Sequence, residues 1–347
     1  MTVAAEPQAK PTTVLVIEDD QEINELLGEY LTLEQIGYVS ALNGTVGLEQ
    51  AAAIHPDAVI LDLMLPDIDG YEIARRITRH RATFDIPVLM LTCMNQDCDR
   101  HKGFACGALH FMNKPFLPDD LLGVLRQALE WRAGLYTRPP QATITVSTAS
   151  PTATLCQLNN MMAELFARTA LSDPTVEQIR EAFENLMAWA LEWGEKNQQD
   201  PGLEIGYRIL AADGELASAT AAPASVEWTL SEKAPGLLAA AFFKPAEAAP
   251  IATSGFSLTQ WAFGGRGAAA PTAELAAAAP ETAGTAANWY VFLGKTGAAH
   301  FDKDSATQTV RLTRPLTGEH GLPVVSADGS RSYPHRLRYE ALAAKRK

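Results

Sequence analysis

The sequence lacks long apolar runs and contains few cysteines. No stretch of the 347 residues approaches the roughly 18 consecutive apolar residues of a membrane-spanning helix, which excludes such a helix. The four cysteines form no C-x-x-C pair and are too few for a disulfide scaffold of this length, so we expect reduced side chains, with metal binding as the alternative. Residues 1–11 lack the apolar core of a secretory signal and are predicted to be a disordered lead-in, so we expect a cytoplasmic protein.

Positive charge is also scarce. Lysine and arginine together number 28 against 41 aspartates and glutamates, which gives a net charge of −13. An acidic chain has no overall attraction to nucleic acid, so DNA or RNA binding would need a local basic patch and is not favoured. With 47% hydrophobic and 20% charged residues the composition is that of an ordinary globular protein, and the length suits about two domains.

Between residues 12 and 134, short apolar runs alternate with helical patterns. The apolar runs are typical of buried strands and lie at 13–17, 38–41, 58–61, 87–91 and 109–112. Helical patterns follow them at 21–35, 45–54, 71–80, 97–106 and from 118 onward. Five apolar strands, each followed by a helix, predict a doubly wound α/β domain whose five-stranded parallel sheet is covered on both faces.

Acidic residues follow two of these strands. Glu18 and Asp19 come after the first strand and Asp62 ends the third, while Thr92 ends the fourth and Lys114 follows the fifth. The carboxyl ends of parallel strands meet at one crevice, and carboxylates gathered there repel one another unless a cation lies among them. A hard divalent ion, most simply Mg²⁺, relieves that repulsion. A lysine and a hydroxyl beside it complete a cradle for a phosphoryl group.

Four segments at these strand ends resemble one known family. They are VLVIEDD at 14–20, ILDLMLPDIDG at 60–70, PVLMLT at 87–92 and GALHFMNKPF at 107–116. Over residues 12–134 the chain resembles the response-regulator receiver domain of two-component signalling. The resemblance implies a flavodoxin-like fold and phosphoryl transfer from a histidine kinase or a phosphotransfer protein. It also implies that the chain is not an enzyme beyond its own phosphorylation and dephosphorylation.

The resemblance assigns roles to the residues of the crevice. Asp62 is the expected phosphoacceptor. Glu18, Asp19 and Asp62 are the expected Mg²⁺ ligands, together with the backbone carbonyl of Met64.

Three further roles follow from the resemblance. Thr92 is the expected switch hydroxyl, Lys114 the residue that pairs with the phosphoryl group, and Phe111 the aromatic switch residue, for which plain core packing is the alternative. The bond between Lys114 and Pro115 is expected to be cis.

Other acidic residues near the crevice are interpreted as structural. Asp20 precedes a helix as an N-cap would, and Asp67 and Asp69 are predicted to be cap or turn residues. Met64 and Met94 stand where the family's side chains border the approach of water to the phosphoryl group. Because a thioether orients water poorly, we expect slow dephosphorylation.

The second half of the chain gives weaker indications. Residues 135–154 are predicted to be a linker, 155–200 a helical hairpin, and 201–347 an uncharacterised α+β or β-rich output domain with an Ala/Pro-rich low-complexity loop at about 267–287. No helix-turn-helix pattern follows residue 140. One hypothesis is signalling through an unknown protein partner, with a homodimer as one form of it. The alternative is a transcription regulator or an enzyme with an unrecognised output domain.

Overall fold

The computed structural model describes residues 12–93, 97–217, 223–233, 237, 298–303, 308–316, 324–325 and 331–332. Contacts divide these residues into two compact units. The first holds residues 12–93 and 106–134, and the second holds 97–105 and the described residues from 135 onward. The predicted lead-in at 1–11 and the predicted loop at 267–287 lie outside the described residues.

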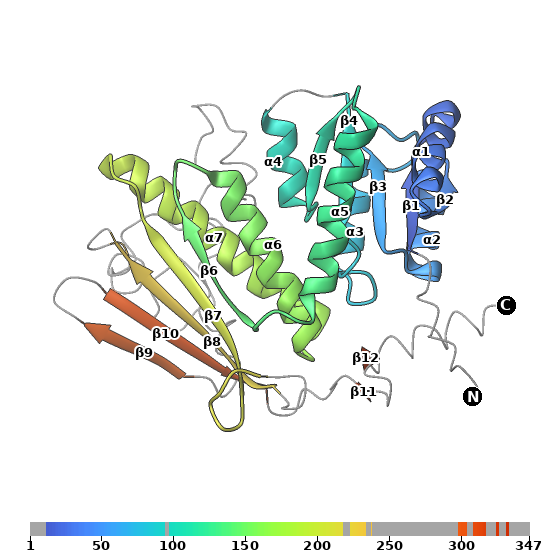
Figure 1. The fold of residues 1–347 in the computed structure, drawn as a ribbon. Coiled ribbons are helices and arrows are strands. Elements are labelled where there is room, and N and C mark those ends of the chain that lie inside the picture. Colours follow the sequence, from blue (N-terminus) through green and yellow to red (C-terminus); the bar gives the residue numbers. More distant parts are fainter. Residues whose placement is uncertain are drawn as a thin grey trace, which may run out of the picture. The chain divides into compact units, whose positions relative to one another are not determined.

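The first unit is built on a parallel sheet, as predicted. Its strands run in the order β2-β1-β3-β4-β5, and every neighbouring pair is parallel (Figure 1). The strands are β1 (Thr13–Ile17), β2 (Gly37–Ala41), β3 (Ala58–Asp62), β4 (Val88–Thr92) and β5 (His110–Asn113). Their order places the ends of β1 and β3 side by side, which brings the segments after these strands together.

Helices cover both faces of this sheet because successive strand residues point to opposite sides. Leu15 and Ile17 of β1 share one buried cluster with Ile73, whereas Val14 and Val16 share the other with Leu27. The helices of this unit are α1 (Gln21–Leu33), α2 (Gly44–Ile54), α3 (Gly70–Thr78) and α5 (Pro118–Leu135). The flavodoxin-like fold class is confirmed.

The second unit contains a five-stranded antiparallel sheet, in the order β6-β7-β8-β10-β9. Its strands are β6 (Gln141–Val146), β7 (Leu203–Ala211), β8 (Pro223–Glu232), β9 (Ala298–Lys303) and β10 (Gln308–Pro315). A separate pair, β11 (Val324–Val325) and β12 (Arg331–Ser332), is also antiparallel. The prediction of a β-rich second domain is confirmed for the described residues.

Two long helices, α6 (Pro151–Arg168) and α7 (Asp173–Asn197), lie along one face of this sheet (Figure 1). Phe183 of α7 and Trp228 of β8 are both buried, with their ring centroids 6.3 Å apart. Buried and half-exposed residues alternate along β8, as expected for a sheet covered on one face. Among the described residues, no helix has both the length and the apolar character to cross a membrane.

The structure differs from the predicted linker at 135–154. Residues 141–146 form β6, in which Ile144 and Val146 are buried while Thr143 and Thr145 are exposed. Only two positions of this strand face the core, so its alternation is too short to stand out among threonines and alanines. The helix α6 also begins at Pro151, inside the predicted linker, because proline suits the first turn of a helix.

The remaining helix, α4 (Asp97–Ala105), follows β4 in the sequence but belongs by its contacts to the second unit. Nε2 of His101 lies 2.9 Å from Oγ1 of Thr152, and Nδ2 of Asn159 donates to the carbonyl of Phe104 at 2.6 Å. Oδ1 of Asn159 in turn accepts from the guanidinium of Arg180 at 2.8 Å. The last turn of α4 is therefore tied to α6, and through α6 to α7.

Candidate functional site

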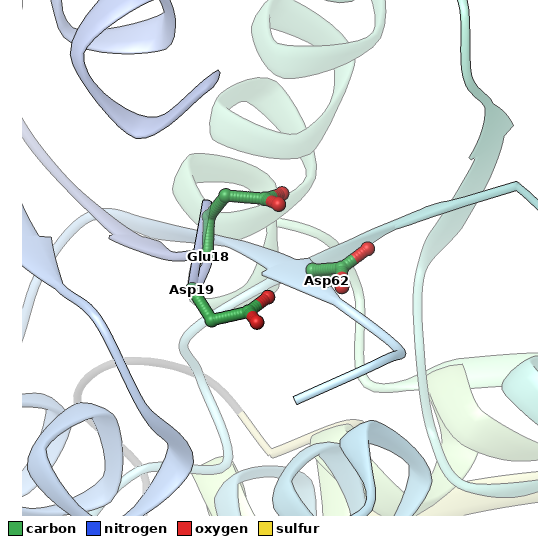
Figure 2. Close-up of side chains that lie close together, drawn as sticks. All are labelled: Glu18, Asp19 and Asp62. Carbon is green, nitrogen blue, oxygen red and sulfur yellow. The ribbon is translucent and has the colours of Figure 1, made fainter. Parts of the chain in front are cut away.

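Three carboxylates converge at the carboxyl edge of the parallel sheet (Figure 2). Glu18 and Asp19 directly follow β1, and Asp62 ends the neighbouring strand β3. One oxygen of each lies within 4.8 Å of the others. Glu18 is 2% exposed and Asp62 4% exposed, whereas Asp19 is open to solvent. In the described part of the chain this is the one acidic, histidine or cysteine cluster compact enough to share a metal ion.

Lys114 bridges two of the three carboxylates. Its Nζ donates to Oε2 of Glu18 at 2.6 Å and to Oδ1 of Asp62 at 2.8 Å. The backbone of Lys114 is fixed as well, because its N–H donates to the carbonyl of Thr92 at 2.7 Å. The peptide bond to Pro115 is cis, as predicted. One ammonium group offsets only one of three negative charges, so the cluster keeps a net negative charge.

The pKa of Glu18 and the pKa of Lys114 are both raised, for different physical reasons. Burial, together with the charges of Asp62 and Asp19, raises the pKa of Glu18 despite the hydrogen bond from Lys114. Burial lowers the pKa of Lys114, but its hydrogen bonds to Asp62 and Glu18 outweigh burial and raise that pKa overall. Oxygen donors with uncompensated negative charge are what a hard divalent cation such as Mg²⁺ takes. The residues present therefore fit a magnesium ion.

Asp62 is held at both of its oxygens. Oδ1 accepts from Lys114, and Oδ2 accepts from the backbone N–H of Met64 at 2.9 Å. Met64 itself is 61% exposed. The carboxylate is thus fixed in direction while the loop residue beside it remains open to water.

The two predicted switch residues lie on the neighbouring strands. Thr92 is fully buried at the end of β4, and its carbonyl accepts from Lys114. Phe111 is half-buried on β5, pairs in register with Met90, and packs against the core cluster of the α2 and α3 face. The structure brings together Glu18, Asp19, Asp62 and Lys114. Phe111 packs against the core, and its switch role stays a prediction.

Asp67 has a larger structural part than the sequence indicated. It caps the N-terminus of α2 and not that of α3, the helix that follows it in the sequence. Its carboxylate accepts from the N–H groups of Gly44 and Thr45 and from the Thr45 hydroxyl, all at 2.6–2.8 Å. The hydroxyl and N–H groups of Thr45 hold the pKa of Asp67 well below its usual range. The predicted caps Asp20 and Asp69 are confirmed, at α1 and α3. Asp67 therefore fastens the loop after Asp62 to the N-terminus of α2.

One buried residue behind the site gave no signal in the sequence. Asn24 lies in α1, and its side-chain amide donates to the carbonyl of Glu18 at 2.9 Å. The apolar spacing of α1 marks the helix but does not distinguish a polar residue that points inward from one that points to solvent.

Residues 14–126 match the response regulator receiver domain family. Over 118 residues the chain is 40% identical to the DNA-binding dual master transcriptional regulator RpaA of Synechocystis sp., covering 33% of this chain and 48% of that protein. It is 36% identical over 123 residues to the phosphate regulon transcriptional regulatory protein PhoB of Pseudomonas aeruginosa, covering 34% and 51%. A solved structure of a putative response regulator from Chloroflexus aurantiacus is 35% identical, covers 35% of this chain and 99% of that one, and has a TM-score of 0.34.

Residues 14–126 are therefore a response regulator receiver domain. The chain spans about half the length of the curated relatives it matches, and the family match ends at residue 126. The relatives named here are regulators of transcription or response regulators.

Proposed function

We propose that this protein is a phosphorylation-activated response regulator in which Asp62 receives a phosphoryl group from a histidine kinase or a phosphotransfer protein. The observation that carries the proposal is the convergence of Glu18, Asp19 and Asp62 with Lys114 bonded between two of them. An oxygen of Asp62 forms the new bond to phosphorus as the bond from phosphorus to the donor nitrogen breaks. The donor nitrogen keeps the electron pair, and the ring leaves as neutral imidazole because its other nitrogen carries a proton. Catalysis in such a transfer is positioning and charge neutralisation.

The chain's own residues meet both needs. Glu18, Asp19, Asp62 and the carbonyl of Met64 are the proposed ligands of Mg²⁺, which supplies positive charge beside the phosphoryl oxygens when it is bound. The ammonium of Lys114 already contacts Asp62 and remains available to pair with the added group. The bonds to the two Asp62 oxygens keep the nucleophile in one orientation, which removes part of the entropy cost of attack.

Labelling with a small phosphodonor tests this proposal. The full chain is treated with acetyl phosphate or phosphoramidate and Mg²⁺, and intact mass and peptide mapping report the modified residue. We expect labelling at Asp62 that is lost in Asp62→Asn and after chelation of the metal. Asp20→Asn is the matched control, because it neutralises an adjacent acidic cap and should leave labelling unchanged. Undiminished labelling of Asp62→Asn, or labelling that ignores the chelator, would contradict the proposal.

We further propose that the second unit carries the output by binding another protein. What supports this is that the second unit holds α4 of the receiver sequence through hydrogen bonds, and that the chain is strongly acidic. The names of RpaA and PhoB favour a second candidate, binding of DNA. Binding of the phosphorylated full chain to bulk DNA at increasing salt separates the two, since a nucleic-acid binder loses affinity steeply with salt. Light scattering on the same samples reports whether a homodimer forms.

A further inference from the structure

Asn24 uses every hydrogen-bonding group of its buried side chain. It is 1% exposed, and its Nδ2 donates to the carbonyl of Glu18 at 2.9 Å and to the carbonyl of Ala41 at 3.3 Å. Its Oδ1 accepts from the hydroxyl of Tyr38 at 2.8 Å. Both amide hydrogens and the amide oxygen are therefore engaged, which fixes the orientation of the amide plane.

These bonds fix the backbone of Glu18 on both sides. Its N–H donates to the carbonyl of Ala41 at 3.1 Å, while its own carbonyl accepts from Asn24. That carbonyl belongs to the peptide that joins Glu18 to Asp19. The direction in which both acidic side chains leave the backbone is therefore set by two hydrogen bonds, one of which comes from Asn24.

The contact between Tyr38 and Asn24 depends on a glycine in α1. A Cβ added at Gly28 would lie 2.6 Å from Cε1 of Tyr38, closer than real Cβ atoms come. The ring of Tyr38, which β2 carries, therefore fits against α1 only because position 28 has no side chain. A glycine in a helix interior is unfavourable relative to alanine. At position 28 the glycine is needed because the Tyr38 ring occupies the space of a Cβ.

We propose that Asn24, oriented by Tyr38, is a positioning residue for the metal-binding acidic pair. The inference rests on the proposed function and adds a residue that acts on the site through the carbonyl of Glu18. Three carboxylates that repel one another turn apart unless their backbones are restrained. The amide of Asn24 keeps Glu18 and Asp19 converged on Asp62 before an ion binds, so that less of the binding energy is used to gather the ligands.

Metal affinity measured directly on the full chain tests this inference. Mn²⁺ binding is followed by electron paramagnetic resonance and Mg²⁺ binding by calorimetry, neither of which needs phosphorylation. Tyr38→Phe removes one hydroxyl, keeps the ring on Gly28, and should weaken Mn²⁺ binding roughly two- to fivefold, as loss of one hydrogen bond does. Asn24→Leu removes the bonds to the Glu18 and Ala41 carbonyls, and should weaken binding roughly tenfold or more.

An asparagine elsewhere in the same domain supplies the matched control. Asn43 caps α2 by accepting from the N–H of Val46, so Asn43→Ala lowers the melting temperature without touching the acidic pair and should leave Mn²⁺ affinity unchanged. If Tyr38→Phe and Asn24→Leu bind Mn²⁺ like the parent chain while melting earlier, Asn24 only stabilises the fold and the inference is overturned. Tyr38→Phe decides alone if Asn24→Leu fails to fold.

Metal binding and phosphorylation are measured separately, so a failure of the proposed function can be told from a failure of this inference. A parent chain that binds Mn²⁺ in the Asn24-dependent way but takes no phosphoryl group on Asp62 refutes the proposed function and supports the inference. A parent chain that binds neither Mn²⁺ nor Mg²⁺ overturns the inference.

Discussion

At the residue scale, the burial of Glu18 in the acidic cluster lowers the folding stability of the metal-free protein at neutral pH. Glu18 is buried beside two other carboxylates, and its pKa in the folded protein is raised. A carboxyl whose folded pKa is raised stabilises the fold only while it is protonated, so this contribution is present below the unfolded pKa and is lost as the pH rises through the folded pKa. At neutral pH without metal, the ionised Glu18 therefore costs stability.

Glu18→Gln should relieve that cost. Glutamine keeps the shape and an oxygen for Lys114 but removes one charge, so we expect the metal-depleted protein to gain on the order of 1 kcal/mol at pH 7. The gain should shrink as the pH falls through the folded pKa of Glu18 and vanish below its unfolded value. Urea unfolding with a chelator at both ends of that range measures it, and Glu29→Gln, an exposed change on α1, is the control. A loss of stability at pH 7 would contradict the argument.

Met64 raises a separate question at the same scale, namely how long a phosphoryl group would last. Its thioether is exposed beside Asp62, where the family resemblance places the path of the attacking water. Met64→Asn introduces an amide that can orient this water, and we expect dephosphorylation to become several-fold to roughly tenfold faster, since about 1.4 kcal/mol off the barrier is a tenfold change. Single-turnover loss of phosphate measures the rate.

Leu33→Asn is the control for that measurement, because it adds the same amide at an exposed apolar position at the far end of α1. Equal decay in Met64→Asn and the parent chain would show that water access at this position does not limit the rate. Met94, the other methionine of the prediction, lies outside the described residues.

At the element scale, two helix glycines should respond oppositely to the same substitution. In α5 a Cβ at Gly123 meets no atom within 4 Å, whereas in α1 a Cβ at Gly28 would strike the ring of Tyr38. We expect Gly123→Ala to stabilise the protein by about 0.5–1 kcal/mol, because alanine loses less backbone entropy in a helix. Gly28→Ala should destabilise it by about 1–3 kcal/mol through overpacking. Equilibrium unfolding of the two variants checks both signs, and two stabilising changes would refute the steric role of Gly28.

The elements of the receiver domain could be predicted because its three central strands, β1, β3 and β4, are buried on both faces. Such strands are short unbroken apolar runs, and the residues after them are read directly from the sequence. β6 was missed since only Ile144 and Val146 face its core. Asn24 was missed, and Asp67 was predicted to be a cap or turn residue without the helix that it caps, for a different reason. Most of their partners are backbone groups of residues that are distant in the sequence, and a backbone carbonyl or N–H leaves no trace in the residue types.

At the scale of the whole molecule, α4 follows β4 of the receiver domain in the sequence and packs against α6 of the second unit. It begins at Asp97, five residues after Thr92, and its last turn is bonded to α6 through Asn159. A phosphoryl group on Asp62 would change the surroundings of Thr92, whose carbonyl already accepts from Lys114. We therefore expect a change at the end of β4 to reach α6 through α4, which is the next helix in the sequence.

Removing the amide that holds α4 should interrupt this route. Asn159→Leu abolishes the bonds to the Phe104 carbonyl and to Arg180, which is 3% exposed, and should lower the free energy of unfolding by about 1–3 kcal/mol. Hydrogen exchange is measured with and without beryllofluoride and Mg²⁺. In the parent chain we expect protection to change near Thr92, in α4 and in α6.

In Asn159→Leu the change near Thr92 should persist while the change in α6 is lost, because the site is intact and only the bonded link is gone. Glu192→Gln, which alters an exposed ion pair on α7, controls for a general effect of substitution in the second unit. The link through α4 would be refuted if α6 responded equally in the variant and in the parent, since another path would then carry the signal. It would also be refuted if beryllofluoride changed the exchange near Thr92 in the parent and left α6 as it was.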